Sequence, residues 1–311
     1  MKKSFAILGL LFLLPAFLFA QEESIRKISI NSKPNQTLKI DNSFGKIEVS
    51  TYDGAYIDVT VVITAEDRKV ERAREFLDNT VIDQDYDGNT VELRTVRKSK
   101  TCKLKNFSID YTVKIPEGTN LDINNRFGDV LIYESGGEVK VDVSHGDCRL
   151  MGVTKSKGKF RNELRVKFGR LEAENIIDGV VRVEHGDINI SRITDSDIDL
   201  RFGNGKVGLL EGEIEIKLSH STLNIDDLGS KIKDFNADVE FSNLRVYGYA
   251  PENFVGHLKG SFSNFKFPKN LSVLSDEPSM NRVEYQIRGK EAGKNAPTIK
   301  VEARHSTVTI K

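Results

Sequence analysis

Four of the five histidines in this 311-residue chain stand in the same context, directly before a Gly or a Ser. Imidazole is the commonest metal ligand in proteins and changes charge near neutral pH, so such a series could bind a metal or sense pH. No two of these histidines have the close spacing of a ligand pair, however, and Phe replaces His in other copies of the context. We therefore expect rings that fill corners of the fold, and no metal site, at His145, His185, His220 and His305.

Three Gly-Asp pairs are similar to the turns of calcium-binding β-rolls, in which glycines and an aspartate recur at fixed offsets. They are Gly128-Asp129, Gly146-Asp147 and Gly186-Asp187. Here the period is about twice that of a β-roll, and Lys46 and Arg170 replace the aspartate in two further copies. Aspartate is also a good turn residue, because its side chain hydrogen-bonds nearby backbone. We expect ordinary turns at these positions and predict no cofactor.

Paired carboxylates are the remaining chemical candidate, because glycoside cleavage needs two acids about 5–10 Å apart. Outward acids of adjacent repeats, for which we take Asp142 and Glu184, could lie that close. Acids mixed with Lys and Arg are also typical of a solvated surface, and the chain has no Trp to stack on a sugar ring. Outward Tyr residues are few, at Tyr133, Tyr247 and Tyr249. We predict no catalytic residue and no enzyme, with a carbohydrate-cleaving protein as the alternative.

The chain has two cysteines, Cys102 and Cys148, without the short Cys-x-x-Cys spacing of a redox pair or zinc site. An exported protein can form a disulfide, yet the sequence cannot place the two Cα atoms within bridging distance. Two small buried side chains or one disulfide both remain compatible with the sequence.

One repeat must position all of these residues: short strands, then an aromatic or His ring, then Gly or Ser, and often a polar residue. From residue 121 the copies follow each other at 17–23 residues, a regularity that indicates a repeat fold. A separate copy occurs early, at Phe44-Gly45-Lys46, and another near the end, at His305-Ser306-Thr307. The consecutive copies begin at Phe127, His145, Phe168, His185, Phe202, His220, Phe241 and Phe262.

Alternation within each copy indicates which side chains face inward. Val139, Val141 and Val143 lead in steps of two to His145, and side chains two apart share one face of a strand. We therefore expect each ring in the last inward position, inside a dry interior. The Gly or Ser that follows would form the tight corner, with Gly supplying positive φ where it is needed.

This pattern predicts an all-β fold, a right-handed parallel β-solenoid whose successive coils stack on each other. No Pro occurs between Pro116 and Pro251, as expected of central strands. A coil could contain about 20 residues, or about 40 with one Phe corner and one His corner. An antiparallel sandwich is the competing topology.

Residues 21–120 differ from the repeat and predict a β-rich capping region with one helix. The helix is expected over residues 64–77, with Thr64 and Asp67 placed like a capping box. Asp87-Gly88-Asn89 predicts a hairpin. Residues 121–311 would form the solenoid, with a loop or hairpin inserted near residues 271–297. The capping region would cover sheet edges that otherwise promote aggregation.

Residues 1–20 have the form of a secretory signal peptide. Lys2 and Lys3 precede an apolar run of about 15 residues, which ends at the small Ala20. The run is short for a membrane span, so we expect no stable membrane insertion after its removal. The 46 basic and 46 acidic residues leave no excess positive charge to attract nucleic acid.

The chain resembles the bacterial putative-adhesin β-helix family, a group of exported domains. The matching segments are 41–49 with Tyr52-Asp53, and 111–116 leading to 121–124, followed by the Gly-Asp repeats. The likeness covers about residues 35 to 311, and Phe or His at the corners departs from the family pattern. The resemblance implies an architecture and an exported location, and it carries over no functional residue.

We therefore expect a non-enzymatic, adhesin-like or scaffolding surface in the cell envelope, located in the periplasm or at the cell surface, or secreted. Its partner would be a protein or a glycan, and not a nucleic acid. A carbohydrate-binding protein and an envelope signalling accessory remain alternatives, and the sequence leaves the oligomeric state open.

Overall fold

The computed structural model describes residues 20–99, 104, 106–152, 161–248, 253–269, 271–276, 281–294 and 296–311. Residues 1–19 of the expected signal peptide, Cys102 and Tyr249 lie outside these ranges. The described chain consists almost wholly of strands, with a single helix among them. The expected all-β class is confirmed.

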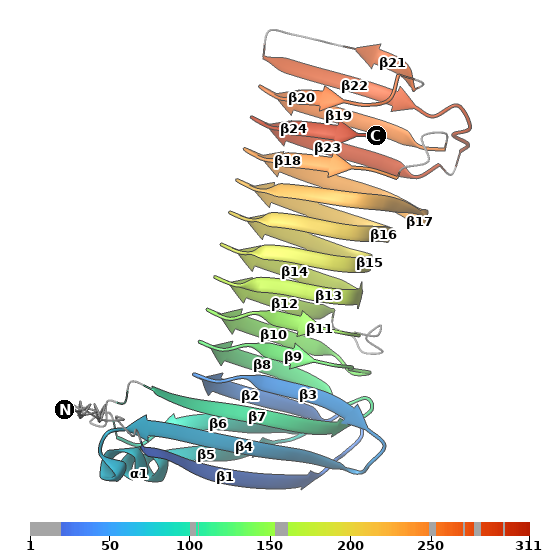
Figure 1. Ribbon diagram of the computed structural model, residues 1–311. Helices are drawn as coiled ribbons and strands as arrows, with labels where there is room; N and C mark the ends of the chain where they lie inside the picture. The colour runs from blue at the N-terminus through green and yellow to red at the C-terminus, as the bar shows by residue number, and fades with distance from the viewer. Residues whose placement is uncertain are drawn as a thin grey trace, which may run out of the picture.

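Most strands belong to two stacked layers, and each coil contributes one strand to each layer (Figure 1). Layer A contains β2 (Thr37–Ser43), β8 (Asn120–Arg126), β10 (Val139–Ser144), β12 (Asn162–Lys167), β14 (Gly179–Glu184), β23 (Thr298–Arg304) and β19 (Val255–Ser261). Layer B contains β3 (Ile47–Tyr52), β9 (Val130–Ile132), β11 (Cys148–Leu150), β13 (Arg170–Ile177), β18 (Asn243–Val246), β24 (Thr307–Ile310) and β20 (Asn264–Lys266). Three long strands run round a corner and so join both layers: β15 (Asp187–Arg201), β16 (Asn204–Ser219) and β17 (Thr222–Glu240).

The pairing register fixes the coil length. Glu163 of β12 pairs with Val180 of β14, and Val180 pairs in turn with Asp197 of β15, all in parallel. One ring position therefore marks one coil of about 20 residues, and the larger coil of about 40 is excluded. The parallel pairing also excludes the antiparallel sandwich for this part of the chain.

Alternating apolar side chains fill the space between the layers. In one coil Val141 and Val143 point in from layer A, and Cys148 and Leu150 point in from layer B. All four are at most 1% exposed. Burying one such side chain contributes about 1.5–3 kcal/mol, so the period-two pattern holds each coil against the opposite layer.

The N-terminal end of the stack is built from antiparallel strands and one helix (Figure 1). Here β1 (Ala20–Asn31) pairs with β4 (Tyr56–Asp67), which pairs with β7 (Asn106–Pro116). The hairpin expected at residues 87–89 is present between β5 (Thr80–Asp87) and β6 (Thr90–Arg97). β6 and β7 continue layers A and B by pairing with β2 and β3.

The helix predicted over residues 64–77 begins later, and its expected capping box is wrong. Helix α1 spans Val70–Asn79, and Lys69 precedes it without a side-chain cap. Thr64 and Asp67 lie in β4, because the alternating burial of that strand continues through Ala65. The helix of the described region is too short to cross a membrane.

The C-terminal end departs from the expected stacking of each coil on its sequence neighbour. β23 and β24, the last strands of the chain, lie between the coil of β17 and β18 and the coil of β19 and β20. Beyond β19, layer A is extended antiparallel by β22 (Arg282–Arg288) and then β21 (Ser272–Asp276). The final strand of the sequence is therefore interior to the stack (Figure 1).

Candidate interaction surface

The rings that were expected to point inward lie on the surface instead. Phe127, Phe168 and Phe202 are each about half exposed, at 49–51%, and Phe262 is 60% exposed. Each ring follows the last residue of a layer A strand, where the chain crosses to layer B. The expectation of rings inside a dry interior is therefore wrong, although the coils themselves are present.

Backbone conformation explains why the alternation rule failed. All ten ring residues have φ between 48° and 67°, in the left-handed region that L-residues seldom adopt. This rotation breaks the period of two and turns the ring outward at the corner. Positive φ was expected at the following Gly, but it falls on the ring residue in every copy.

The ten rings form one continuous column, here called the ring ladder. Neighbouring ring centroids are 4.8–5.1 Å apart and the ring planes are within 1–22° of parallel. In spatial order the ladder reads Phe44, Phe127, His145, Phe168, His185, Phe202, His220, Phe241, His305 and Phe262.

Phe and His alternate without exception from Phe127 to the end of the ladder. Along the sequence the alternation fails, because two consecutive copies of the repeat both carry Phe, at Phe241 and Phe262. The insertion of β24 restores the order in space by placing His305 between them. Each histidine therefore has a phenyl ring on both faces, and a Phe separates it from the next histidine.

The residue after each ring packs against the preceding coil. A Cβ added to Gly186 would lie 1.9 Å from the carbonyl oxygen of Gly169, and Gly128, Gly146 and Gly203 are equally close to their neighbours. Glycine is therefore required for close approach and not for its φ. In the last four coils serines occupy this column, and their hydroxyls accept backbone N–H groups from the neighbouring coil at 2.9–3.3 Å.

The three Gly-Asp pairs use their carboxylates within the fold. The backbone N–H of Asp147 donates to Asp129 at 2.8 Å, and that of Arg170 donates to Asp147 at 2.8 Å. Asn204 donates to Asp187 in the same way, at 2.9 Å. These aspartates join one coil to the next, as expected of turn residues. No three metal-ligating side chains of the described residues form a cluster that could hold an ion.

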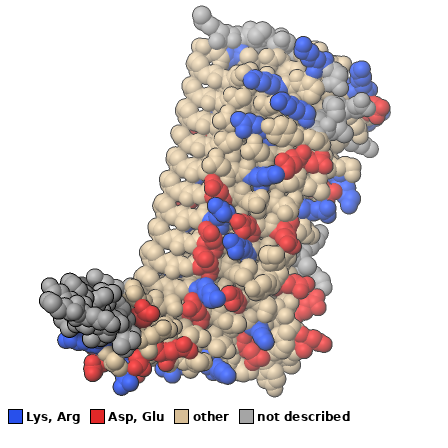
Figure 2. Space-filling model, in the orientation of Figure 1, with Lys and Arg blue, Asp and Glu red and all other residues tan. Residues whose placement is uncertain are grey.

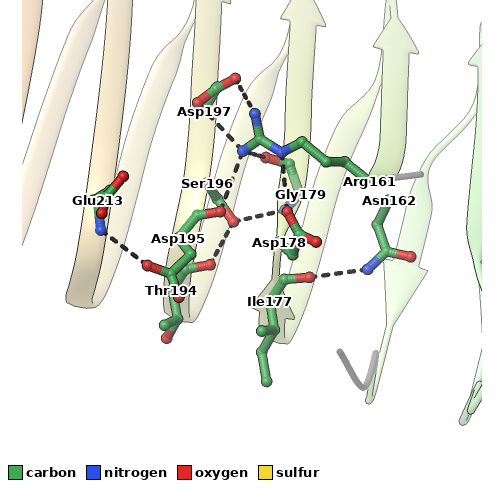
Figure 3. Close-up of polar contacts among 10 residues, drawn as sticks. All are labelled: Arg161, Asn162, Ile177, Asp178, Gly179, Thr194, Asp195, Ser196, Asp197 and Glu213. Atoms are coloured by element: carbon green, nitrogen blue, oxygen red, sulfur yellow. Dashed lines mark hydrogen bonds and ion pairs between the residues drawn. The ribbon is translucent and has the colours of Figure 1, made fainter. Parts of the chain in front are cut away.

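A second corner, on the opposite edge of the stack, contains a compact polar cluster around Arg161 (Figure 3). The Arg161 guanidinium donates to Asp197 at 2.6 Å, to Asp178 at 3.1 Å and to the carbonyl of Gly179 at 2.9 Å. Burial alone would lower the pKa of Arg161, but the hydrogen bond and charge of Asp197, with Asp178, keep it above its ordinary value. Arg161 therefore neutralises the carboxylates of Asp178 and Asp197 and joins three coils.

The carboxylates considered for glycoside cleavage are not neighbours. Asp142 lies in β10 and Glu184 in β14, and β12 runs between these strands with Arg165 and Lys167 facing them. Glu184 forms an ion pair with Lys167 at 3.4 Å. The expectation that the two acids lie on adjacent coils is therefore wrong, because one complete coil separates them.

The described cysteine is buried and free of a disulfide. Cys148 points into the core from layer B, and burial raises the pKa of its thiol to about 12. Cys148 is therefore a small core side chain, whereas Cys102 lies outside the described residues. Of the outward Tyr residues, Tyr133 is 51% exposed.

Charge is distributed unevenly over the face of layer B. Figure 2 shows an uncharged edge at the left, with red and blue side chains mixed over the lower part of the face and mostly blue ones beside this edge near the top. The lower part contains ion pairs such as Arg149–Glu172 at 2.7 Å and Lys46–Glu48 at 2.8 Å. Sequence reasoning missed the ladder and its flanks because the alternating pattern placed the rings inside the fold.

Residues 25–243 match the protein-family model described as Toastrack DUF4097. A solved structure named as a putative adhesin from Parabacteroides merdae is 10% identical, with a TM-score of 0.40, and covers 92% of this chain and 96% of its own. One from Parabacteroides distasonis, also named as a putative adhesin, is 11% identical, with a TM-score of 0.39 and coverages of 93% and 97%. No curated protein matches the chain.

Proposed function

The chain belongs to the Toastrack DUF4097 family, and we propose that it acts as a non-catalytic interaction scaffold in the cell envelope. The family match confirms the resemblance noted in the sequence. In this proposal the stacked coils are a rigid support, and the ring ladder with the adjoining face of layer B is the surface presented to a partner.

One observation carries this proposal: from Phe127 onward the ladder is exposed, unbroken and alternates between Phe and His in space. A left-handed backbone costs an L-residue roughly 1–2 kcal/mol, and the chain adopts it at every ring. Stacking contributes about 0.5–1.5 kcal/mol per pair, which offsets that cost without a clear surplus. A small turn residue would serve the corner equally well, so stability alone does not account for nine exposed rings in a ladder of ten.

We also propose an exported location and a capped solenoid architecture. Residues 1–20 would direct export to the periplasm or the cell surface. Residues 21–120 would close one end of a right-handed solenoid formed by residues 121–311, since crossovers between parallel strands are nearly always right-handed. The strands β7, β4 and β1 support this role because they extend layer B, as β6 and β5 extend layer A, and so cover the edges of the last coil there.

The absence of catalysis is also a proposal, supported by how the acids are used. Asp129, Asp147 and Asp187 accept backbone N–H groups, and Asp178 and Asp197 bind Arg161. Carboxylates engaged in this way are poor candidates for proton transfer, which needs a group free to take up or release a proton.

Sedimentation with isolated cell envelopes tests the scaffold proposal. In the test variant Phe127, Phe168 and Phe202 are replaced by Asn, which tolerates a left-handed backbone. The control is Tyr86→Asn, which removes a 59% exposed ring from the N-terminal hairpin. Wild type and control should sediment with the envelopes, and the folded triple variant should stay in solution. Equal sedimentation of all three would refute a role for the ladder.

A further inference from the structure

The last five coils of the ladder have a different flank from the earlier ones. The residue two positions after each ring faces outward from layer B, and in the earlier coils it is charged, as in Asp129, Asp147 and Arg170. In the last five coils it is always an amide or a hydroxyl. In spatial order this amide–hydroxyl strip consists of Asn204, Thr222, Asn243, Thr307 and Asn264.

The side chains of the strip are free for a ligand because a different group accepts the backbone N–H at the corners of the last coils. In the Gly-Asp coils the aspartate side chain accepts the backbone N–H of the next coil. In the Ser coils that N–H donates to a backbone carbonyl instead, as from Asn243 to Ser221 at 2.9 Å and from Thr307 to Ser242 at 3.0 Å. Within the part of the chain that the structure describes, the side chains of Thr222, Asn243, Thr307 and Asn264 make no hydrogen bond.

A hollow of about 470 Å³ lies along the end of the strip. Its lining includes the rings Phe241, His305 and Phe262 and the strip residues Asn243, Thr307 and Asn264. Both faces of Phe241 and His305 are covered by neighbouring rings, so these two offer only their ring edges, a phenyl edge and an imidazole edge with its nitrogens.

Positive charge borders the strip on the side away from the ladder. The next outward positions in layer B include Lys206, Arg245 and Lys266, and no acid occupies this column in the last five coils. Lys206 is paired with Asp226 at 3.0 Å, whereas Arg245 and Lys266 are exposed and form no ion pair with a described residue. Figure 2 shows Lys and Arg side chains on the upper part of this face.

We propose that this strip binds a linear acidic polysaccharide laid along the axis of the stack. Amides and hydroxyls would hydrogen-bond sugar hydroxyls, and Arg245 and Lys266 would bind carboxylates. Asn and Thr alternate in step with Phe and His, so the surface repeats every two coils. That repeat is twice the 4.8–5.1 Å ring spacing, close to the length of an extended β-linked disaccharide unit.

A lipid surface fits the same observations less well. Lipids require no repeat along the edge, and an anionic membrane lying along the whole ladder would meet Asp129, Asp147 and Asp187. The inference deepens the proposed function, on which it rests, by naming the partner class for one part of the surface.

Binding of matched oligosaccharides to the mature protein tests the inference. The probes are β-linked oligomannuronate, its neutral counterpart oligomannose, and vesicles of anionic lipid. The test variant is Asn243→Ala with Asn264→Ala, and the control is Asn189→Ala, an exposed amide in layer B outside the strip. Thermal unfolding would check that each variant is folded.

Wild type and control should bind oligomannuronate, and the double variant should bind it at least about tenfold more weakly, as expected for lost hydrogen bonds. Lys266→Ala should also weaken binding and reduce its dependence on salt. Equal binding of oligomannose, binding of vesicles alone, or an unaffected double variant would each overturn the inference. Envelope sedimentation that survives such a result would leave the scaffold proposal standing.

Discussion

At the residue scale, each corner combines one unfavourable conformation with one close approach. The ring residue adopts positive φ, and the Gly or Ser after it packs onto the neighbouring coil. The two requirements fall on different residues, so a ring position tolerates changes that keep a left-handed backbone, whereas a Gly position tolerates almost none.

Gly186→Ala should destabilise the protein by about 1–3 kcal/mol, the usual cost of overpacking. The new Cβ would lie 1.9 Å from the carbonyl oxygen of Gly169, so the backbone of two coils would have to shift. Gly293→Ala is the control, because nothing lies within 4 Å of its Cβ position. Urea denaturation should show a clear loss for the first and a change within about 0.5 kcal/mol for the second. Equal effects would contradict the close packing of the corners.

Cys148 should be inert to alkylation in the native protein. Burial raises the pKa of its thiol from 9.0 to about 12, so the folded chain keeps a proton that the unfolded chain loses between these values. The free energy of unfolding should therefore fall as pH rises from 9 towards 12. Mass spectrometry of a Cys102→Ser variant treated with iodoacetamide should show labelling after denaturation only. Native labelling at the unfolded rate would contradict burial of Cys148.

At the element scale, the two corners of a coil are held in different ways. The ladder corner relies on repeated small contacts of the same kind, coil after coil. The opposite corner is held by a local polar cluster, in which the Arg161 guanidinium reaches Asp178, Gly179 and Asp197 across three coils (Figure 3). A planar group with several donors suits this task, and a Lys ammonium cannot reproduce its geometry.

Arg161→Lys should therefore cost about 1–2 kcal/mol, a value reduced from that of a buried charged hydrogen bond because Arg161 is partly exposed. Arg149→Lys is the matched control, since Arg149 forms an exposed pair with Glu172 alone on the layer B face. Its cost should stay within about 0.5 kcal/mol. Thermal denaturation of both variants compares them directly, and a larger loss for Arg149→Lys would contradict a joining role for Arg161.

At the scale of the whole molecule, sequence reasoning recovered what depends on local periodicity. Val139, Val141 and Val143 alternate as a strand must, and the Gly and Ser positions mark one corner per coil, so the coil could be predicted. The outward rings could not, because the alternation rule assumes negative φ and fails at His145.

The order of the last coils could not be predicted either, since it depends on which strand edge β23 occupies and not on local pattern. The separation of Asp142 from Glu184 was within reach of the sequence, because the copy at Phe168 stands between the copies that contain them. The amide–hydroxyl strip could not be predicted because it depends on the order of the last coils. Thr307 and Asn264 become neighbours only once the coils are ordered in space.

The ladder supplies its own reporters for the claim that it is a binding surface. Four histidines belong to it: His145, His185, His220 and His305. The fifth, His257, lies in strand β19 of layer A, which pairs with β22. Histidine-selective NMR should therefore be recorded before and after addition of solubilised envelope polysaccharide. The signals of His220 and His305 should shift most, and that of His257 should stay unchanged. Binding that leaves all four ladder signals in place, or that moves only His257, would contradict the ladder as the site of interaction.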